Sequence, residues 1–132
     1  MIQIQRNFNH SDIFKFIGEN EPEKALALID KKINIEEDLE EKCWLYIYQS
    51  WIYYALYMYY PLTHNSVNLV LKHREELSNY IVAEAYIIRA LAHIKQKKYL
   101  YALDSAEICL KIDANNTTAK KLYELILLLL KK

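Results

Sequence analysis

Residues 83–116 read AEAYIIRALAHIKQKKYLYALDSAEICLKIDANN, and this stretch decides the fold. Its apolar residues recur at the three- and four-residue spacing of amphipathic helices, over about 80–96 and again over 99–112. Only a short polar connection separates the two runs. A connection of that length makes consecutive helices lie antiparallel, so the stretch predicts a helical hairpin as the building unit of the protein.

The composition of the whole chain extends this prediction to an all-α fold. The chain has 132 residues, of which 53% are hydrophobic and 26% are charged, and Gly18 is its one glycine. Sheet hairpins and phosphate-binding loops both depend on glycine. The composition therefore excludes β-barrel, Rossmann, P-loop and α/β-hydrolase folds. The length fits one domain, so we predict a single helical domain over 1–132.

Apolar periodicity and capping signals predict seven helices. The expected helices span about 11–17, 21–33, 36–60, 64–78, 80–96, 99–112 and 117–130. We expect Ser11 to cap the first helix, Gly18 to end it in a left-handed conformation, and Asn20 to cap the second. Pro61 should end the long helix. Three alternatives stay open for residues 1–9: a short strand at 2–5, a helix start or a frayed arm.

Residues 44–60 read WLYIYQSWIYYALYMYY and carry no charge. The length of this stretch approaches that of a membrane span. Seven of its seventeen residues are tyrosine, however, and Gln49 and Ser50 lie near its centre. Tyrosine favours the membrane interface over the hydrocarbon middle. The stretch therefore favours a buried central helix over a transmembrane one, and we expect no membrane partner.

Charge is unevenly distributed along a chain whose net charge is zero. Residues 19–41 carry nine acids and three bases, whereas residues 89–132 carry nine bases and four acids. Without an overall basic excess, the chain is not expected to bind nucleic acid. The acidic segment is either a solvated helical face or a patch for a basic partner or for head-to-tail self-contact.

No residues stand at the spacing that catalysis or metal binding requires. The four histidines are His10, His64, His73 and His93. They are not at ligand spacing from one another or from a cysteine, and the carboxylates clustered at 36–41 fan around a helix. We therefore expect no enzyme activity, no metal and no cofactor. His93 is expected to fill an aromatic position between helices.

The two cysteines, Cys43 and Cys109, both lie in apolar helical patterns. Such residues are typical of reduced, buried thiols in a cytosolic protein. The first ten residues, MIQIQRNFNH, lack the basic segment and apolar run of a signal peptide. We therefore expect a cytoplasmic protein in which the two cysteines are not linked.

Residues 83–116 resemble a tetratricopeptide repeat along their whole length. The matching positions are Tyr86, Ala90, Tyr99 and Ala102. The departures from the pattern are Arg89, His93, Ala106 and Ala114. Residues 41–78 and 11–33 resemble such repeats loosely, and 117–130 is similar to the helix that closes such arrays. The resemblance implies antiparallel hairpins stacked as a short α–α superhelix with a C-terminal capping helix.

The resemblance also implies a non-enzymatic module that binds a peptide or protein surface in a groove. Arrays of this kind bind on the concave wall made by the first helix of each pair. In the matching repeat, the wall would carry Ile87, Leu91, Ile94 and Lys95. Because these residues are mostly apolar, we expect an apolar partner segment rather than a carboxylate held by basic side chains.

A stripe of tyrosines is a second candidate for the binding surface. Tyr53, Tyr57 and Tyr60 recur at the four- and three-residue spacing that places side chains on one helical face. The stripe either fills the core or faces the groove, where tyrosine combines apolar area with a hydroxyl group.

The resemblance to tetratricopeptide arrays implies a scaffold, a secretion chaperone or an immunity protein that neutralises a toxin. A helical-bundle enzyme is the alternative class.

The last predicted helix has more apolar surface than a closing helix needs. Asn116 or Thr117 should cap it, and residues 125–130 read LILLLL, which covers its whole circumference. We expect one side to pack on the 99–112 helix, and the expected packing residues are Leu122, Leu125, Ile126 and Leu129. Leu127, Leu128 and Leu130 should stay partly exposed. Either this tail frays, or the exposed leucines meet a second copy, a partner or the N-terminal arm.

Overall fold

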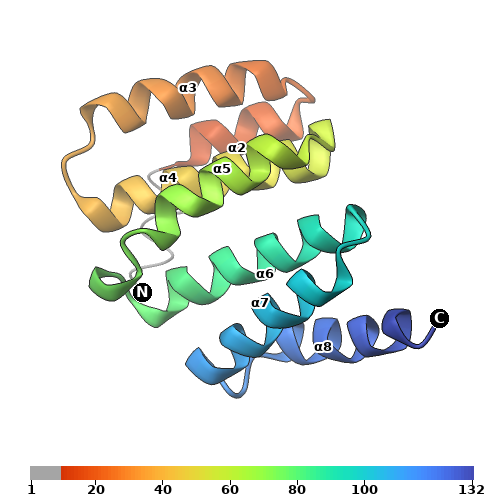
Figure 1. Ribbon diagram of the computed structural model, residues 1–132. Helices are drawn as coiled ribbons and strands as arrows, with labels where there is room; N and C mark the ends of the chain where they lie inside the picture. Colours follow the sequence, from red (N-terminus) through yellow and green to blue (C-terminus); the bar gives the residue numbers. More distant parts are fainter. Residues whose placement is uncertain (1–9) are drawn as a thin grey trace.

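The computed structural model describes residues 10–132, and every regular element in this part of the chain is helical (Figure 1). The α-helices are α2 (Ser11–Gly18), α3 (Pro22–Ile35), α4 (Leu39–Ile52), α5 (Tyr60–Leu71), α6 (Asn79–Lys95), α7 (Tyr99–Ile112) and α8 (Thr117–Leu130). A π-helical turn, η1 (Tyr53–Tyr57), and a 3₁₀ turn, η2 (Arg74–Glu76), complete the set. The all-α prediction is confirmed, whereas the strand considered for residues 2–5 lies outside the described residues.

Consecutive helices pack on one another and form a stack (Figure 1). Some helices that are not consecutive in the sequence are also in contact: α4 touches α6, and α6 touches α8. Buried apolar side chains from all seven α-helices join in one cluster. Helix α6 lies between α4 and α8, and its buried residues include four alanines, Ala83, Ala85, Ala90 and Ala92. Such small side chains let neighbouring helices approach closely.

The sequence predicts the helices of the C-terminal half accurately. Both α7 and α8 have the predicted bounds, and α6 begins and ends one residue earlier than expected. Asn116 caps α8 as expected, because its side-chain oxygen accepts a hydrogen bond from the amide of Ala119 at 2.9 Å. Ala90 and Ala102, the small residues of the predicted hairpin, are fully buried.

The connection between α2 and α3 differs from the prediction. His10, rather than Ser11, precedes the first helical residue, and no side-chain hydrogen bond caps this end. Gly18 stays within α2, and Asn20 takes the left-handed conformation with φ of 58°. The amide of Glu21 then donates to the Phe16 carbonyl at 2.8 Å and closes the turn. Asparagine tolerates this conformation better than most residues, so the turn does not need the glycine.

The predicted long helix over 36–60 is wrong at both ends. It begins at Leu39, because Asp38 accepts a hydrogen bond from the Glu41 amide at 2.9 Å. Towards its C-terminus, α4 passes into η1, and Met58 then turns the chain with a left-handed φ of 52°. Pro61 therefore lies in the first turn of α5 instead of ending the preceding helix. In the described part of the chain, no helix has both the length and the apolarity needed to cross a membrane.

Both cysteines are buried and unlinked, as predicted. Cys43 lies in α4 and Cys109 lies in α7. Burial raises the pKa of each thiol to about 11. Both side chains are therefore protonated and chemically inert at neutral pH.

Candidate functional site

One side of α6 carries a continuous stripe of side chains, which we call the α6 stripe. It consists of Tyr80, Glu84, Ile87, Leu91 and Ile94. These positions are spaced four, three, four and three residues apart, so their side chains lie along one side of the helix. The stripe contains three of the wall residues predicted from the sequence, and it extends that wall by two turns towards the N-terminus of α6.

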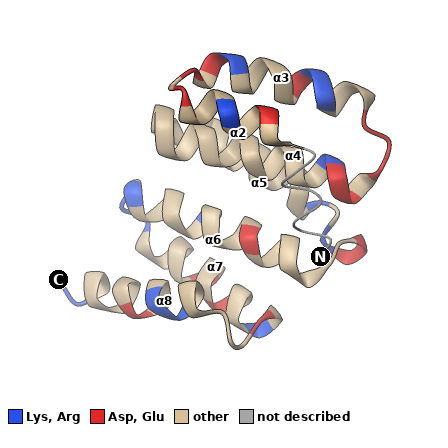
Figure 2. Ribbon diagram, turned by 180° about the vertical axis from the view of Figure 1, so that it is seen from behind, with Lys and Arg blue, Asp and Glu red and all other residues tan. Residues whose placement is uncertain are grey.

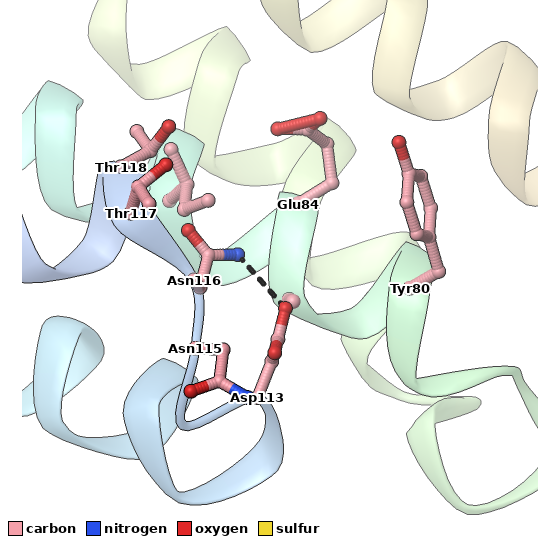
Figure 3. A pocket seen from close by; sticks show the side chains of 9 residues that line it. Tyr80, Glu84, Asp113, Asn115, Asn116, Thr117 and Thr118 are labelled. Atoms are coloured by element: carbon pink, nitrogen blue, oxygen red, sulfur yellow. Dashed lines mark hydrogen bonds between the residues drawn. The ribbon is translucent and has the colours of Figure 1, made fainter.

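The N-terminal half of the α6 stripe borders a pocket, which we call the α6–α8 pocket (Figure 3). The residues that line it are Tyr80, Ala83, Glu84, Ile87, Asp113, Asn115, Asn116, Thr117 and Thr118. They come from α6, from the turn between α7 and α8, and from the first turn of α8. Its volume of about 320 Å³ lies at the lower end of the range for ligand sites.

Asn116 holds the turn side of the pocket in place. Its side-chain oxygen caps α8 through the Ala119 amide, and its side-chain nitrogen donates to the Asp113 carboxylate at 3.3 Å. The backbone N–H of Asn116 also donates to the backbone carbonyl of Asp113 at 3.1 Å. One asparagine therefore fixes both the start of α8 and the position of the Asp113 carboxylate (Figure 3).

Glu84 is the unusual residue of the pocket. It projects from the N-terminal half of α6 and is partly buried, and this burial raises the pKa of its carboxyl group. Within residues 10–132, no ion pair or hydrogen bond engages its side chain. The described lining includes no basic residue, so Glu84 and Asp113 give the pocket a negative potential.

Of the predicted wall residues, Ile87 alone lines this pocket. Ile87 is buried at the α6 side of the pocket, and Leu91 and Ile94 continue the α6 stripe as half-buried residues. Lys95 lies in a different hollow, together with Tyr54, Ala55, Met58 and Tyr60. The predicted wall is thus divided between two places on the molecule.

The predicted tyrosine stripe is broken by η1 and the left-handed turn at Met58. Tyr53 and Tyr57 still contact each other, with ring centroids 6.1 Å apart. Tyr60 belongs to α5, and its ring lies against Tyr54 at 6.1 Å. The three tyrosines therefore do not share one helical face, because the π-helical turn changes the angular spacing of the residues that follow it.

The outer face of α8 is apolar, as predicted, but α8 is rotated relative to the expectation. Leu127, Leu128 and Leu130 are exposed by 37%, 59% and 38% of their surface. Leu125, a predicted packing residue, is 44% exposed. The packed face is centred on Ala119, Leu122 and Ile126, and Leu125 lies about a quarter turn away from it.

A pair of histidines lies at the opposite end of α6 from the pocket. The rings of His64 and His93 are 4.4 Å apart, and His93 also packs against Tyr101 at 5.5 Å. His93 therefore occupies the aromatic position between helices that the sequence predicts. Burial lowers its pKa to about 4, and His64, Arg89 and Lys98 add to the effect. In the described residues, no three His, Cys, Asp or Glu side chains gather as metal ligands.

Sequence reasoning missed the two carboxylates of the pocket. A signal for Glu84 was nevertheless present, because it is the only charged residue between Glu76 and Arg89. Charged residues are seldom buried without a partner, so an isolated acid within the apolar half of a buried helix indicates a candidate functional position. Asp113 has no such signal, since its role depends on how the turn places it beside α6.

Comparison with protein families, curated proteins and solved structures found no significant match. The likeness of residues 83–116 to a tetratricopeptide repeat accordingly stays a prediction from the sequence. What the α6–α8 pocket binds must therefore be inferred from its own residues.

Proposed function

We propose that this protein is a non-enzymatic protein-binding module that contacts its partner with the α6 stripe and the α6–α8 pocket. The observation that carries this proposal is the continuity of the two: an apolar and aromatic stripe leads directly into a polar pocket. Protein interfaces combine these features, with aliphatic and aromatic residues at the core and polar groups that give specificity.

The chemistry of the pocket fits binding better than catalysis. Its titratable side chains, apart from Tyr80 at the rim, are Glu84 and Asp113. Asp113 is held by Asn116, and the described lining offers no histidine, cysteine or lysine to act with either carboxylate. Acid–base or nucleophilic catalysis needs such groups within hydrogen-bond reach of each other.

The distribution of charge favours a basic partner. Figure 2 shows acidic residues in the connection between α3 and α4, away from the carboxylates that line the pocket, whereas α3 itself carries both acidic and basic residues. Complementary charge speeds association and selects among partners. A basic target fits the immunity-protein variant of the proposal, in which the module neutralises a toxin by covering its surface.

A charge-reversal experiment tests the proposal. The wild type, Glu84→Arg and the control Glu107→Arg are used to capture partners from the source cells, and the captured protein is purified and titrated by calorimetry. Glu107 is an exposed acid on α7, so its reversal changes the net charge equally away from the pocket.

We expect Glu84→Arg to weaken binding by at least about tenfold, because it places two like charges in one interface. Glu107→Arg should bind as the wild type does. Equal affinity of all three proteins for the purified partner would contradict the proposal. Thermal melts of both variants show whether each is folded.

A further inference from the structure

We propose that the α6–α8 pocket receives an arginine side chain of the partner and that its guanidinium group lies between Glu84 and Asp113. This inference rests on the proposed function, since it names the part of the partner that the site recognises. It is carried by the shape of the pocket, the two carboxylates and the acceptors around them.

The first step of the argument is charge. A partly buried carboxylate without a partner destabilises the folded protein, because burial removes water from the charged form. Glu84 is in this state within the described chain. A cation that enters the pocket would offset that cost through a charge-assisted hydrogen bond, the stronger kind of hydrogen bond in proteins.

The second step is the arrangement of acceptors. Glu84 comes from α6 and Asp113 from the α7–α8 turn, so the two carboxylates border the pocket from different elements (Figure 3). The side chains of Asn115, Thr117 and Thr118 supply further oxygen atoms. A guanidinium group has five donors in a planar fork and can reach acceptors on several sides, whereas a lysine ammonium has three donors at one point.

The third step is the apolar surface. Tyr80 is 56% exposed at the rim of the pocket, where its ring offers a face on which a guanidinium group can stack. Ala83 and Ile87 provide apolar contacts for the methylene groups of the same side chain. The volume of about 320 Å³ suits one long side chain rather than a larger ligand.

The N-terminus of α8 does not reverse this preference. Helix N-termini attract anions through their unpaired amide groups. In this helix the Asn116 side chain already accepts from the Ala119 amide, and Asp113 places a negative charge next to the same end. The charges at the pocket are therefore those of two carboxylates, which select a cation.

A titration followed by two-dimensional NMR tests the inference without the partner. The probes are arginine blocked at both ends as an acetyl methylamide, the equivalent blocked citrulline, which is neutral but has the same shape, and blocked lysine. We expect arginine to shift the amide signals of Glu84, Asp113 and Thr118 with a Kd of about 1–20 mM, as expected for one side chain. Citrulline should bind at least about tenfold more weakly, and lysine about threefold more weakly.

Glu84→Gln and the control Glu107→Gln complete the test. Glu84→Gln should weaken arginine binding at least about fivefold and raise the melting temperature by about 1–3 °C, because the buried charge is gone. Glu107→Gln should change neither. Equal shifts with citrulline, shifts centred outside the pocket, or unchanged binding by Glu84→Gln would overturn the inference.

The experiments distinguish two failures: that the pocket does not bind an arginine side chain, and that the proposed function is wrong. If any of these overturning results occurs while Glu84→Arg still weakens partner binding by at least about tenfold, the proposed arginine contact is wrong and the proposed function stands. If blocked arginine binds as expected but Glu84→Arg leaves partner binding unchanged, the pocket takes a cation and the proposed function is wrong.

Discussion

The two ends of α6 border surfaces of opposite character. At its N-terminal end, the α6–α8 pocket is concave, polar and lined by carboxylates. At its C-terminal end, the α6–α7 turn lies beside the last residues of α8, and Leu130 shares a hollow with Lys97–Tyr101. We call this second surface the lysine end. Lys97 and Lys98 line this hollow, and Figure 2 shows basic residues in the α6–α7 turn and at the C-terminus of the chain.

The difference shows that one short helix, α8, contributes to two kinds of surface. Its first turn closes the pocket through Asn116, where recognition depends on charge and hydrogen bonds. Its last turns carry Leu127, Leu128 and Leu130, where any contact would depend on burial of apolar surface. Leu100 and Tyr101 add to this apolar surface, with 71% and 60% of their area exposed.

The largest expected effect is on the free energy of unfolding, when Ile126, which packs α8 onto the rest of the molecule, is truncated. Ile126 is fully buried under α8, whereas Leu128, two residues further along, is 59% exposed. We expect Ile126→Ala to lower the free energy of unfolding by about 2–4 kcal/mol, through lost burial and the cavity that remains. Leu128→Ala should lower it by less than about 0.5 kcal/mol. Urea unfolding of both variants checks this, and equal losses would contradict the packing of α8.

The next effect is a pH dependence that differs between the two ends. Burial lowers the pKa of His93 to about 4, against an ordinary value of 6.5. As the pH falls, the unfolded chain protonates His93 at a higher pH than the folded protein does. The contribution of His93 to stability is therefore complete above pH 6.5 and falls as the pH drops to 4. The loss amounts to about 3 kcal/mol at most, and solvent around the partly exposed ring reduces it. Glu84 acts with the opposite sign, since burial raises the pKa of its carboxyl group and protonation relieves the cost of its charge.

Urea unfolding between about pH 4 and pH 7.5 measures this dependence. His93→Phe keeps the ring between His64 and Tyr101 and should remove most of the slope. His73→Gln, at a half-exposed histidine that pairs with Glu76, is the control and should keep it. A slope that survives in His93→Phe would show that the buried histidine is not its source.

The smallest expected effect concerns the oligomeric state, because we expect weak self-association through α8. We expect light scattering of the wild type to show a concentration-dependent approach to twice the 15.8 kDa chain mass. Leu127→Lys/Leu130→Lys should remain monomeric, because the lysines add charge to the surface that would be buried. Ile35→Lys, at an exposed position of α3, is the control and should associate as the wild type does. A wild type that stays monomeric at every concentration contradicts this prediction.

The two halves of the chain also differ in how well their sequence predicts their structure. Helices α7 and α8 have the expected bounds because a cap, Asn116, and apolar periodicity give the same answer there. Around residues 53–60 the local signals conflict. Pro61 is compatible both with the end of one helix and with the first turn of the next, and nothing in the pattern indicates a π-helical turn.

The candidate site is predictable only in part, for a similar reason. Helical spacing is sufficient to place Ile87, Leu91 and Ile94 on one side of α6. The pocket itself depends on the distance between α6 and the α7–α8 turn, so Asp113 and Asn116 enter it only through tertiary packing. The rotation of α8, which exposes Leu125, likewise depends on which of its apolar sides finds the better fit.

Site-specific photo-crosslinking tests the central claim, that the partner contacts the pocket, most directly. Tyr80 at the pocket and Tyr101 near the lysine end are similarly exposed, at 56% and 60%, and are replaced in turn by the photoreactive residue p-benzoylphenylalanine. We predict that irradiation in the source cells links the partner to position 80, that Glu84→Arg abolishes this adduct, and that position 101 gives no such adduct. A partner adduct of equal yield at both positions, or one at position 80 that is unaffected by Glu84→Arg, would contradict the claim.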